Sequence, residues 1–127
     1  MKKVLVVDDE VEICSLIKQL LAKYDYDVVT AASAEEALEI EKKEDIYVYF
    51  FDMQLPGMDG IELIKRIKYL RPSGIFYAIT GYSSVYDLLK CREAGFDDYF
   101  PKPFKLTQIV KATIDAFEKI DRWQNSI

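Results

Sequence analysis

Short apolar segments alternate with amphipathic segments along this chain, and this alternation restricts its fold more than any other feature. The apolar segments, such as KVLVV and IYVYFF, are rich in β-branched or aromatic residues and are bounded by polar residues or glycine. Such segments are typical of strands that are buried on both faces of a sheet. The expected strands cover residues 3–7, 26–30, 46–51, 74–80 and 97–100.

The segments between these strands space their apolar residues as amphipathic helices do. Ser33 and Glu36 form a capping box before the second helix, and Asp59 is a typical N-cap for the third. The pair Pro56-Gly57 suits a type II turn just before that third helix. The expected helices cover residues 11–23, 34–43, a segment after Asp59, about 84–94, and the chain from 104 onward.

Strand and helix units that alternate in this way predict an α/β fold, in which a parallel sheet carries helices on both faces. The chain has 127 residues, of which 50% are hydrophobic, and it contains no linker, repeat or low-complexity stretch. These properties suit a single domain with one core. Pro101 lacks the N–H group that a central strand would donate, so we expect the fifth strand at an edge of the sheet.

Composition excludes several functional classes. Acids outnumber bases by 22 to 17, which disfavours direct binding to nucleic acid. The longest apolar run, residues 46–51, is too short to cross a membrane, and the N-terminus is unlike a signal peptide, so we expect a cytoplasmic protein. The sequence has no histidine, which removes histidine-dependent catalytic and zinc sites. Cys14 and Cys91 show no metal or disulfide spacing and are expected to be packed thiols.

Polar side chains stand where four of the expected strands end. Asp8 and Asp9 follow the first strand, Asp52 the third, Thr80 ends the fourth, and Lys102 follows the fifth. Sites of parallel α/β sheets lie at these carboxyl ends. If the first and third strands are neighbours, three carboxylates share one crevice and need a compensating charge, such as Mg²⁺ and a lysine ammonium. Acids, a cation, an ammonium and a hydroxyl together predict a site for a phosphoryl group.

Taken singly, each of these residues has a simpler explanation. Asp8 and Asp9 can cap the first helix, Thr80 can be an ordinary strand-end residue, and Lys102 can be a solvated charge. Asp52 is harder to explain, because it directly follows the apolar run VYFF. The occurrence of all five at strand ends favours a functional site.

Four segments, in order, resemble the response-regulator receiver domain of two-component signalling, and in particular its chemotaxis-regulator-like members. They are VLVVDDE, FDMQLPGMDGIEL, AIT and DDYFPKPF, and the resemblance runs from Lys2 to about Ile120. The block from Asp52 to Gly60, together with the other three, makes it specific. The resemblance implies a flavodoxin-like sheet of order 2-1-3-4-5 in one receiver domain, residues 1–127, with a core of about 2–120 and a short tail, 123–127.

The resemblance also implies a role for each strand-end residue. Asp52 resembles the phosphoacceptor, whose carboxylate would attack the phosphorus of a phosphohistidine on a partner and form an aspartyl phosphate. Asp8, Asp9, Asp52 and the backbone carbonyl of Gln54 would hold Mg²⁺, with Mn²⁺ as a substitute. Lys102 would contact the phosphoryl group.

Thr80 and Tyr99 resemble a switch pair, in which Thr80 hydrogen-bonds the phosphoryl group and Tyr99 turns inward. Without the resemblance, Tyr99 is more simply an aromatic residue that packs at an edge strand. The Lys102–Pro103 bond resembles one that is cis in this family. The switching surface would comprise the fourth helix, the fifth strand and the fifth helix.

In this interpretation the protein is a phosphoaccepting signalling domain, which catalyses its own phosphorylation and slow dephosphorylation and is not a conventional enzyme. The expected partners are a sensor histidine kinase or a histidine phosphotransfer protein, and an unknown downstream protein. We expect no output domain in this chain, no direct nucleic-acid binding and no membrane insertion. The segment KLTQIVKATI carries only lysines where DNA-binding dimers are arginine-rich, so we expect a monomer or weak dimer.

Some positions depart from the common pattern. Gly81 stands where alanine is more usual, which leaves more room beside the phosphoryl group. The resemblance places Gln54 and Tyr82 at positions that vary in the family and tune the lifetime of the phosphate, and implies that Tyr82 could screen attacking water.

Other functional classes compete with this interpretation. A phosphate-independent interaction module would keep the fold, although the complete set of acids, threonine and lysine argues against it. A flavodoxin-type FMN binder would need a phosphate loop rich in Ser, Thr and Gly in place of Asp8-Asp9-Glu10. A phosphatase of the haloacid-dehalogenase type would carry its nucleophile after the first strand, usually in a D-x-D motif and a longer chain.

Overall fold

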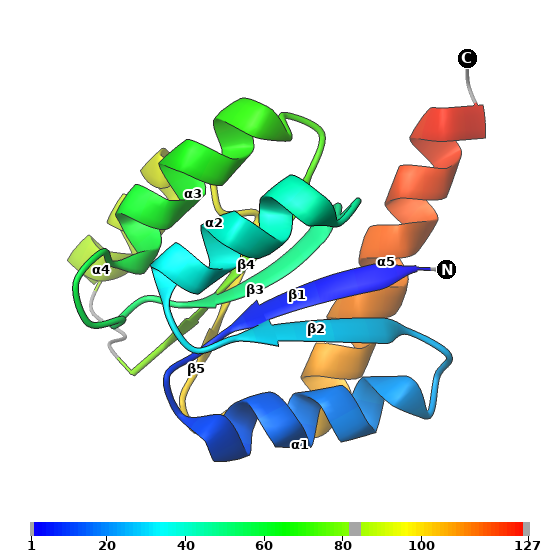
Figure 1. Ribbon diagram of the computed structural model, residues 1–127, viewed down its shortest axis with the longest axis horizontal. Helices are drawn as coiled ribbons and strands as arrows, with labels where there is room; N and C mark the ends of the chain where they lie inside the picture. Colours follow the sequence, from blue (N-terminus) through cyan, green and yellow to red (C-terminus); the bar gives the residue numbers. More distant parts are fainter. Residues whose placement is uncertain (1, 82–84, 126–127) are drawn as a thin grey trace.

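The computed structural model describes residues 2–81 and 85–125, and within them a five-stranded sheet lies between two layers of helices (Figure 1). The strands are β1 (Lys3–Val7), β2 (Asp27–Ala31), β3 (Val48–Asp52), β4 (Ile75–Thr80) and β5 (Asp98–Pro101). The helices are α1 (Val11–Ala22), α2 (Ala34–Lys43), α3 (Gly60–Leu70), α4 (Val85–Ala94) and α5 (Leu106–Asn125).

The strand order is β2-β1-β3-β4-β5, and every neighbouring pair is parallel. The predicted flavodoxin-like, doubly wound α/β fold is therefore confirmed, with the Pro101 strand at an edge. The winding of the chain reverses between β1 and β3, which is where sheets of this kind open a crevice. Val7 pairs with Phe51 across these two strands, so Asp8 and Asp52 come next to each other at the carboxyl edge.

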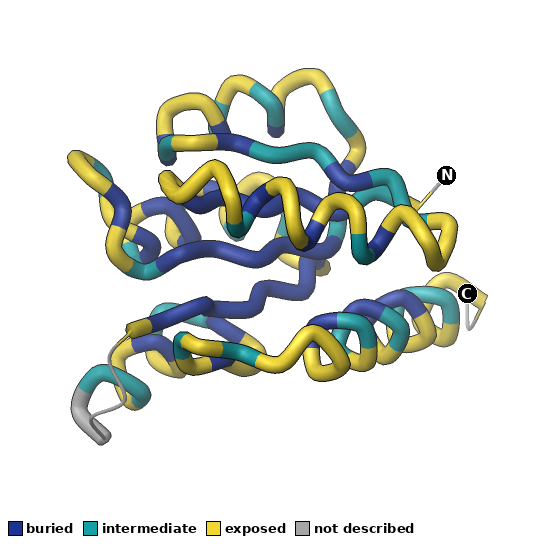
Figure 2. Tube along the Cα trace, turned by 90° about the horizontal axis from the view of Figure 1, so that it is seen from below, coloured by how far each residue is buried: buried dark blue, intermediate teal, exposed yellow. Residues whose placement is uncertain are grey.

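The helices divide into two layers. One face of the sheet packs against α2, α3 and α4, and the other packs against α1 and α5 (Figure 1). Figure 2 shows the strands buried between helices whose outward sides are exposed. Cys14 and Cys91 are both buried free thiols, as expected. Among the described helices, none is both long enough and apolar enough to cross a membrane.

A buried polar network lies at the amino end of β3. The ring of Tyr49 stacks on Phe76 with centroids 4.5 Å apart, and its hydroxyl lies 2.8 Å from Glu41 Oε2. Arg71 Nε donates to Glu41 Oε1 at 2.9 Å. Burial raises the pKa of Glu41, while the hydrogen bonds from Tyr49 and Arg71 oppose that rise. The network joins α2, β3 and the end of α3 with a carboxylate that has two strong donors.

Local signals in the sequence start the helices where they were expected. Ser33 Oγ accepts from the Glu36 N–H at 3.1 Å, and Asp59 Oδ1 accepts from the Glu62 N–H at 3.0 Å. Gly57 has φ +77°, the left-handed conformation that a type II turn requires at its third residue.

Some predicted boundaries were wrong by one or two residues. The third strand begins at Val48 and includes Asp52, because Asp52 itself pairs with Ile79 of β4. The last helix begins at Leu106 and not at residue 104, since the backbone N–H of Lys105 bonds the Gln108 side chain. The fourth helix begins at Val85, and the predicted start at residue 84 lies outside the described residues.

Helix α5 extends past the sheet, and its last turns lie at the same end of the molecule as the start of β1, where Lys2 Nζ is 3.3 Å from Asp121 Oδ2 (Figure 1). Trp123, in its last turns, is 70% exposed and lines a hollow with Tyr47, Gly74 and Ile75. Tyr47 and Gly74 immediately precede β3 and β4, so Trp123 lies at the amino edge of the sheet, opposite the crevice.

Candidate functional site

The predicted carboxylates come together at the carboxyl edge of the sheet. One oxygen from each of Asp8, Asp9 and Asp52 lies within 4.8 Å of the other two. The ammonium of Lys102 lies 3.3 Å from an oxygen of Asp8 and 3.3 Å from an oxygen of Asp52. Thr80 is buried at the end of β4, one residue beyond the partner of Asp52. All five strand-end residues therefore lie at this one edge of the sheet, which we call the crevice.

The position of Asp52 is fixed by the strand that carries it. Every residue of β3 is buried, and Asp52 Oδ1 accepts a hydrogen bond from the Gln54 N–H at 3.0 Å. Gly60, the first residue of α3, lets this helix approach the strand closely. A Cβ atom there would lie 2.9 Å from the Asp52 carbonyl oxygen and 2.9 Å from Met53 Sδ. Gly60 is thus part of the frame that holds Asp52, although the sequence pattern alone did not identify it.

Asp8 is fully buried, and its two carboxylate oxygens have different partners. Oδ1 accepts from the Glu10 N–H at 2.8 Å, while Oδ2 lies 3.3 Å from the Lys102 ammonium but has no hydrogen bond within the described part of the chain. Burial raises the pKa of Asp8 to about 6; the Glu10 N–H opposes this shift, Asp52 adds to it, and Lys102 opposes it. A buried carboxylate oxygen without a hydrogen bond, beside two other carboxylates, is a donor set that suits a hard divalent cation.

Lys102 is the cationic group of the crevice. Its backbone N–H donates to the Thr80 carbonyl at 2.7 Å, which fixes it beside β4. Burial lowers its pKa, but Asp52 and Asp8 outweigh this effect and raise the pKa overall, so the lysine stays charged. A fourth carboxylate, Glu10, also lies 3.3 Å from this ammonium. Three carboxylates lie 3.3 Å from this one ammonium, and Asp9 lies beside two of them, so the site is net negative and attracts a cation.

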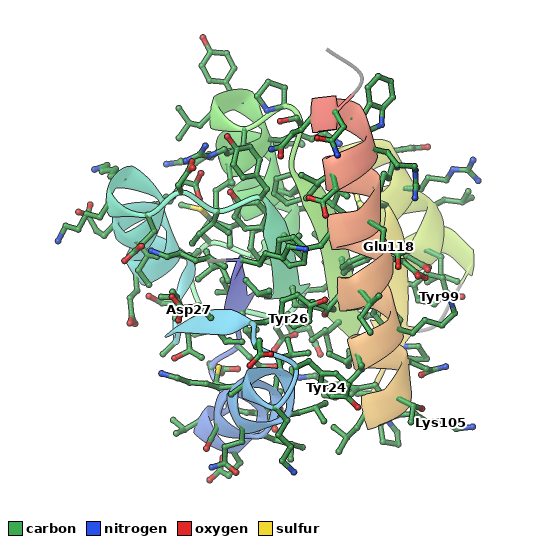
Figure 3. The ribbon with its side chains drawn as sticks, turned by 90° about the vertical axis from the view of Figure 1, so that its right-hand side faces the viewer. Tyr24, Tyr26, Asp27, Tyr99, Lys105 and Glu118 are labelled. Carbon is green, nitrogen blue, oxygen red and sulfur yellow. The ribbon has the colours of Figure 1, made fainter. Side chains whose placement is uncertain are left out.

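Glu10 was not predicted as part of the site. It directly continues the acidic run after β1, and that position is the only signal in the sequence for its role. Tyr99 stands on β5 with 37% of its surface exposed (Figure 3). The Lys102–Pro103 peptide is cis, as expected. Tyr82 lies outside the described residues, and Gly81 lies beside Gln54, whose Oε1 is 3.5 Å from where a Cβ would be.

The arrangement can support attack by a carboxylate on an anionic electrophile. Asp52 is buried, one of its oxygens is held by a backbone N–H, and the other lies beside a fixed ammonium. Charge brought in by a phosphoryl group would meet Lys102 and any cation held by the acids. Phosphoryl transfer needs positioning and charge compensation of this kind.

Comparisons with known proteins identify the family and the fold of this chain. A family model, the response regulator receiver domain, matches residues 4–114. Sporulation initiation phosphotransferase F of Bacillus subtilis is 34% identical over 85% of this chain and 87% of its own length. The alkaline phosphatase synthesis transcriptional regulatory protein PhoP of the same species is 36% identical over 92% of this chain. The chain spans only 50% of PhoP.

Solved structures give the same picture. A CheY-like receiver domain protein from Methanospirillum hungatei superposes with a TM-score of 0.87 at 32% identity, covering 100% of this chain and 99% of that one. The BeF3-activated DrrB receiver domain superposes with a TM-score of 0.86 at 31% identity, covering 93% of this chain and 98% of that one.

Proposed function

Because this chain belongs to the response regulator receiver domain family of two-component systems, we propose that Asp52 accepts a phosphoryl group from a phosphohistidine. The observation that carries this proposal is the geometry of Asp52, a buried carboxylate with one oxygen fixed by a backbone N–H and the other beside Lys102. The chain itself has no histidine, so the donor belongs to a partner, either a sensor kinase or a phosphotransfer protein.

In the proposed reaction an oxygen of Asp52 attacks phosphorus. The new O–P bond forms as the P–N bond to imidazole breaks, and the electron pair of that bond returns to the imidazole nitrogen. Lys102 stays in place and compensates the charge of the transferred group. In the reset step water attacks phosphorus, the O–P bond to Asp52 breaks with its electron pair returning to the carboxylate, and inorganic phosphate leaves.

The residues present fit a divalent cation, for which Mg²⁺ is the expected ion and Mn²⁺ a substitute. Asp8, Asp9, Asp52 and the backbone carbonyl of Gln54 would hold it, and the ion when bound supplies charge neutralisation to the phosphoryl oxygens. The oxygen of Asp8 without a hydrogen bond and the clustered carboxylates support this assignment.

Signalling would follow through Thr80 and Tyr99. Thr80 is buried at the crevice, and Tyr99 is partly exposed on the neighbouring strand, which is the outward state of the proposed switch. When Thr80 moves to hydrogen-bond the phosphoryl group, Tyr99 would turn inward and change the surface of α4, β5 and α5. A fluorine label on Tyr99 should report this as a chemical-shift change that requires Asp52.

The mouth of the crevice suits a protein donor. Val11, the first residue of α1 after the acids, is 69% exposed, and Leu106 at the start of α5 is exposed as well. Apolar side chains beside an acidic crevice would let a helical partner dock and present its histidine. The similarity to a phosphotransferase over 87% of that protein's length also supports a relay role, in which the phosphate is passed on.

The test is intact mass after incubation with acetyl phosphate, with Mg²⁺ or with EDTA. We expect a gain of one phosphoryl group that requires both Mg²⁺ and Asp52, so that Asp52→Asn gains none. Asp97→Asn, which changes an exposed aspartate away from the crevice, is the matched control and should gain as much as wild type. Absence of any gain in a rapid-quench repeat would instead favour a phosphate-independent interaction module.

A further inference from the structure

The outer surface of α2 and α3 forms a groove that the proposed phosphoryl chemistry does not use. This groove has a volume of about 760 Å³ and lies between the two helices. Its α2 side carries Glu35, Leu38 and Lys42, and its α3 side includes Glu62 and Arg66. We call this surface the α2–α3 face.

Exposed apolar side chains lie at one end of the α2–α3 face. Tyr69 is 87% exposed and Leu70 is 58% exposed, and both line the groove. Tyrosine adds a large, rigid contact area to an interface at a low cost in conformational entropy. An exposed aromatic residue that lines a groove is therefore a feature of interaction surfaces.

Charge is segregated along the same face. Both helices follow parallel strands, so they run in the same direction and both begin near the carboxyl edge of the sheet. Glu35 and Glu62 lie in the first turns, whereas Lys42 lies in the last turn of α2. Lys65 and Arg66 follow Glu62 toward the other end. Apart from Glu39, which lies in the second half of α2 and pairs with Lys42, the face thus has an acidic end and a basic end.

The helix dipole explains part of this pattern, because acids are favoured in first turns and bases in last turns. It does not explain why Tyr69 and Leu70 stay exposed on the same stripe. The face has two intrahelical ion pairs, Lys42–Glu39 at 3.1 Å and Arg66–Glu62 at 3.3 Å. Each of their four side chains is at least half exposed to solvent. Exposed ion pairs contribute little to the stability of the fold, so replacing them with ion pairs between two molecules costs little free energy.

We propose that the α2–α3 face binds a second copy of this chain. A two-fold axis perpendicular to the groove would set the helices of the two copies antiparallel. The acidic end of each copy then meets the basic end of the other, and each Tyr69 reaches the end of the partner's groove where its Met58 lies. This self-complementarity selects a second copy over an unrelated partner.

The test is sedimentation velocity over a range of protein concentrations, which does not depend on phosphorylation. One variant, Lys65→Glu with Arg66→Glu, makes both ends acidic; a second, Glu35→Lys with Glu62→Lys, makes both ends basic. We expect each variant alone to stay monomeric where wild type associates. A mixture of the two variants should form a heterodimer, because one of the two charge contacts then keeps its original sign and the other is restored with reversed sign.

Two further variants separate surface chemistry from general charge effects. Tyr69→Ser should weaken association about tenfold without affecting the fold. Lys18→Glu with Lys23→Glu changes the charge equally on the opposite side of the molecule and should leave association unchanged. Wild type that stays monomeric at every concentration, or variants that fail to associate when mixed, would overturn the proposal.

Discussion

Asp8 illustrates how a residue in the site works against the stability of the fold. Its carboxyl has a pKa of about 6 in the folded protein, above the ordinary value of 3.8 that it has when unfolded. Below pH 3.8 it is protonated in both states and changes nothing. As the pH rises toward 6, the unfolded chain ionises more readily than the folded one, so stability is lost over this window and stays lower above it.

We therefore predict that Asp8→Asn stabilises the cation-free protein at pH 7.5 by roughly 1–3 kcal/mol, since each unit of pKa shift corresponds to about 1.4 kcal/mol. The gain should disappear near pH 4. Urea denaturation in EDTA at both pH values measures this. Asp9→Asn, which changes an exposed carboxylate, serves as control and should have the smaller effect. Equal gains at both pH values would show that ionisation of Asp8 is not the cause.

Gly81 and Gly57 make a matched pair of glycines. A Cβ at Gly81 meets only Gln54 Oε1 at 3.5 Å, an ordinary contact, whereas Gly57 has φ +77°. Gly81→Ala should stabilise the protein by about 0.4–1 kcal/mol by restricting the unfolded chain. Gly57→Ala should destabilise it, because alanine is strained at that φ. Chemical denaturation measures both, and destabilisation by Gly81→Ala would contradict the first expectation.

At the scale of elements, the link between α2, β3 and α3 depends on Arg71. Without its guanidinium, buried Glu41 keeps only the Tyr49 hydroxyl as a strong donor, and its raised pKa should rise further. We expect Arg71→Ala to cost roughly 2–4 kcal/mol at pH 7 and less near pH 4.5, where Glu41 is protonated more easily. Arg66→Ala removes an exposed ion pair from the same helix and should cost about 0.5 kcal/mol or less.

Thermal or urea unfolding at the two pH values distinguishes these cases. If the loss in free energy of unfolding of Arg71→Ala is independent of pH, lost packing against the Tyr47 ring, 4.7 Å from the guanidinium, matters more than the unpaired charge of Glu41.

The order and type of the elements followed from the sequence, because period-two and helical patterns are local. Capping by Ser33 and Asp59 was visible in the same way. The Glu41–Arg71 pair could not be predicted, because the two residues are 30 positions apart and each looks like an ordinary surface charge within its own segment. Strand ends were also misplaced by a residue or two, because pairing across the ladder decides them and not local composition.

At the scale of the whole molecule, strand position should govern local stability. β3 lies at the centre of the sheet with both neighbours paired, whereas β5 is a short edge strand that ends in Pro101. We predict that amides of Val48–Asp52 exchange with deuterium far more slowly than those of β5. Exchange followed by NMR tests this, with β2, the other edge strand, as an internal comparison. Slow exchange throughout β5 would contradict the prediction.

The site could be predicted as a set of strand-end residues because parallel strands bring their carboxyl ends to one edge. That argument reached Asp8, Asp9, Asp52, Thr80 and Lys102. It did not identify Gly60, which matters because it lets a helix approach a strand end closely. Nor did it identify the oxygen of Asp8 that has no hydrogen bond. Both are properties of packing in three dimensions, which the positions of residues at strand ends do not reveal.

The placement of Trp123 has an optical consequence. It is the chain's single tryptophan, it is 70% exposed, and it lies at the amino edge of the sheet while the carboxylates lie at the carboxyl edge. Its emission should therefore resemble that of indole in water, and a soluble quencher should reach it easily. Because none of the described residues that line its hollow belongs to the crevice, its fluorescence should not change during ion binding at Asp8 and Asp52. Its emission will instead report changes around the final turns of α5, so the protein has an intrinsic fluorescent reporter at the end of the molecule opposite its carboxylates.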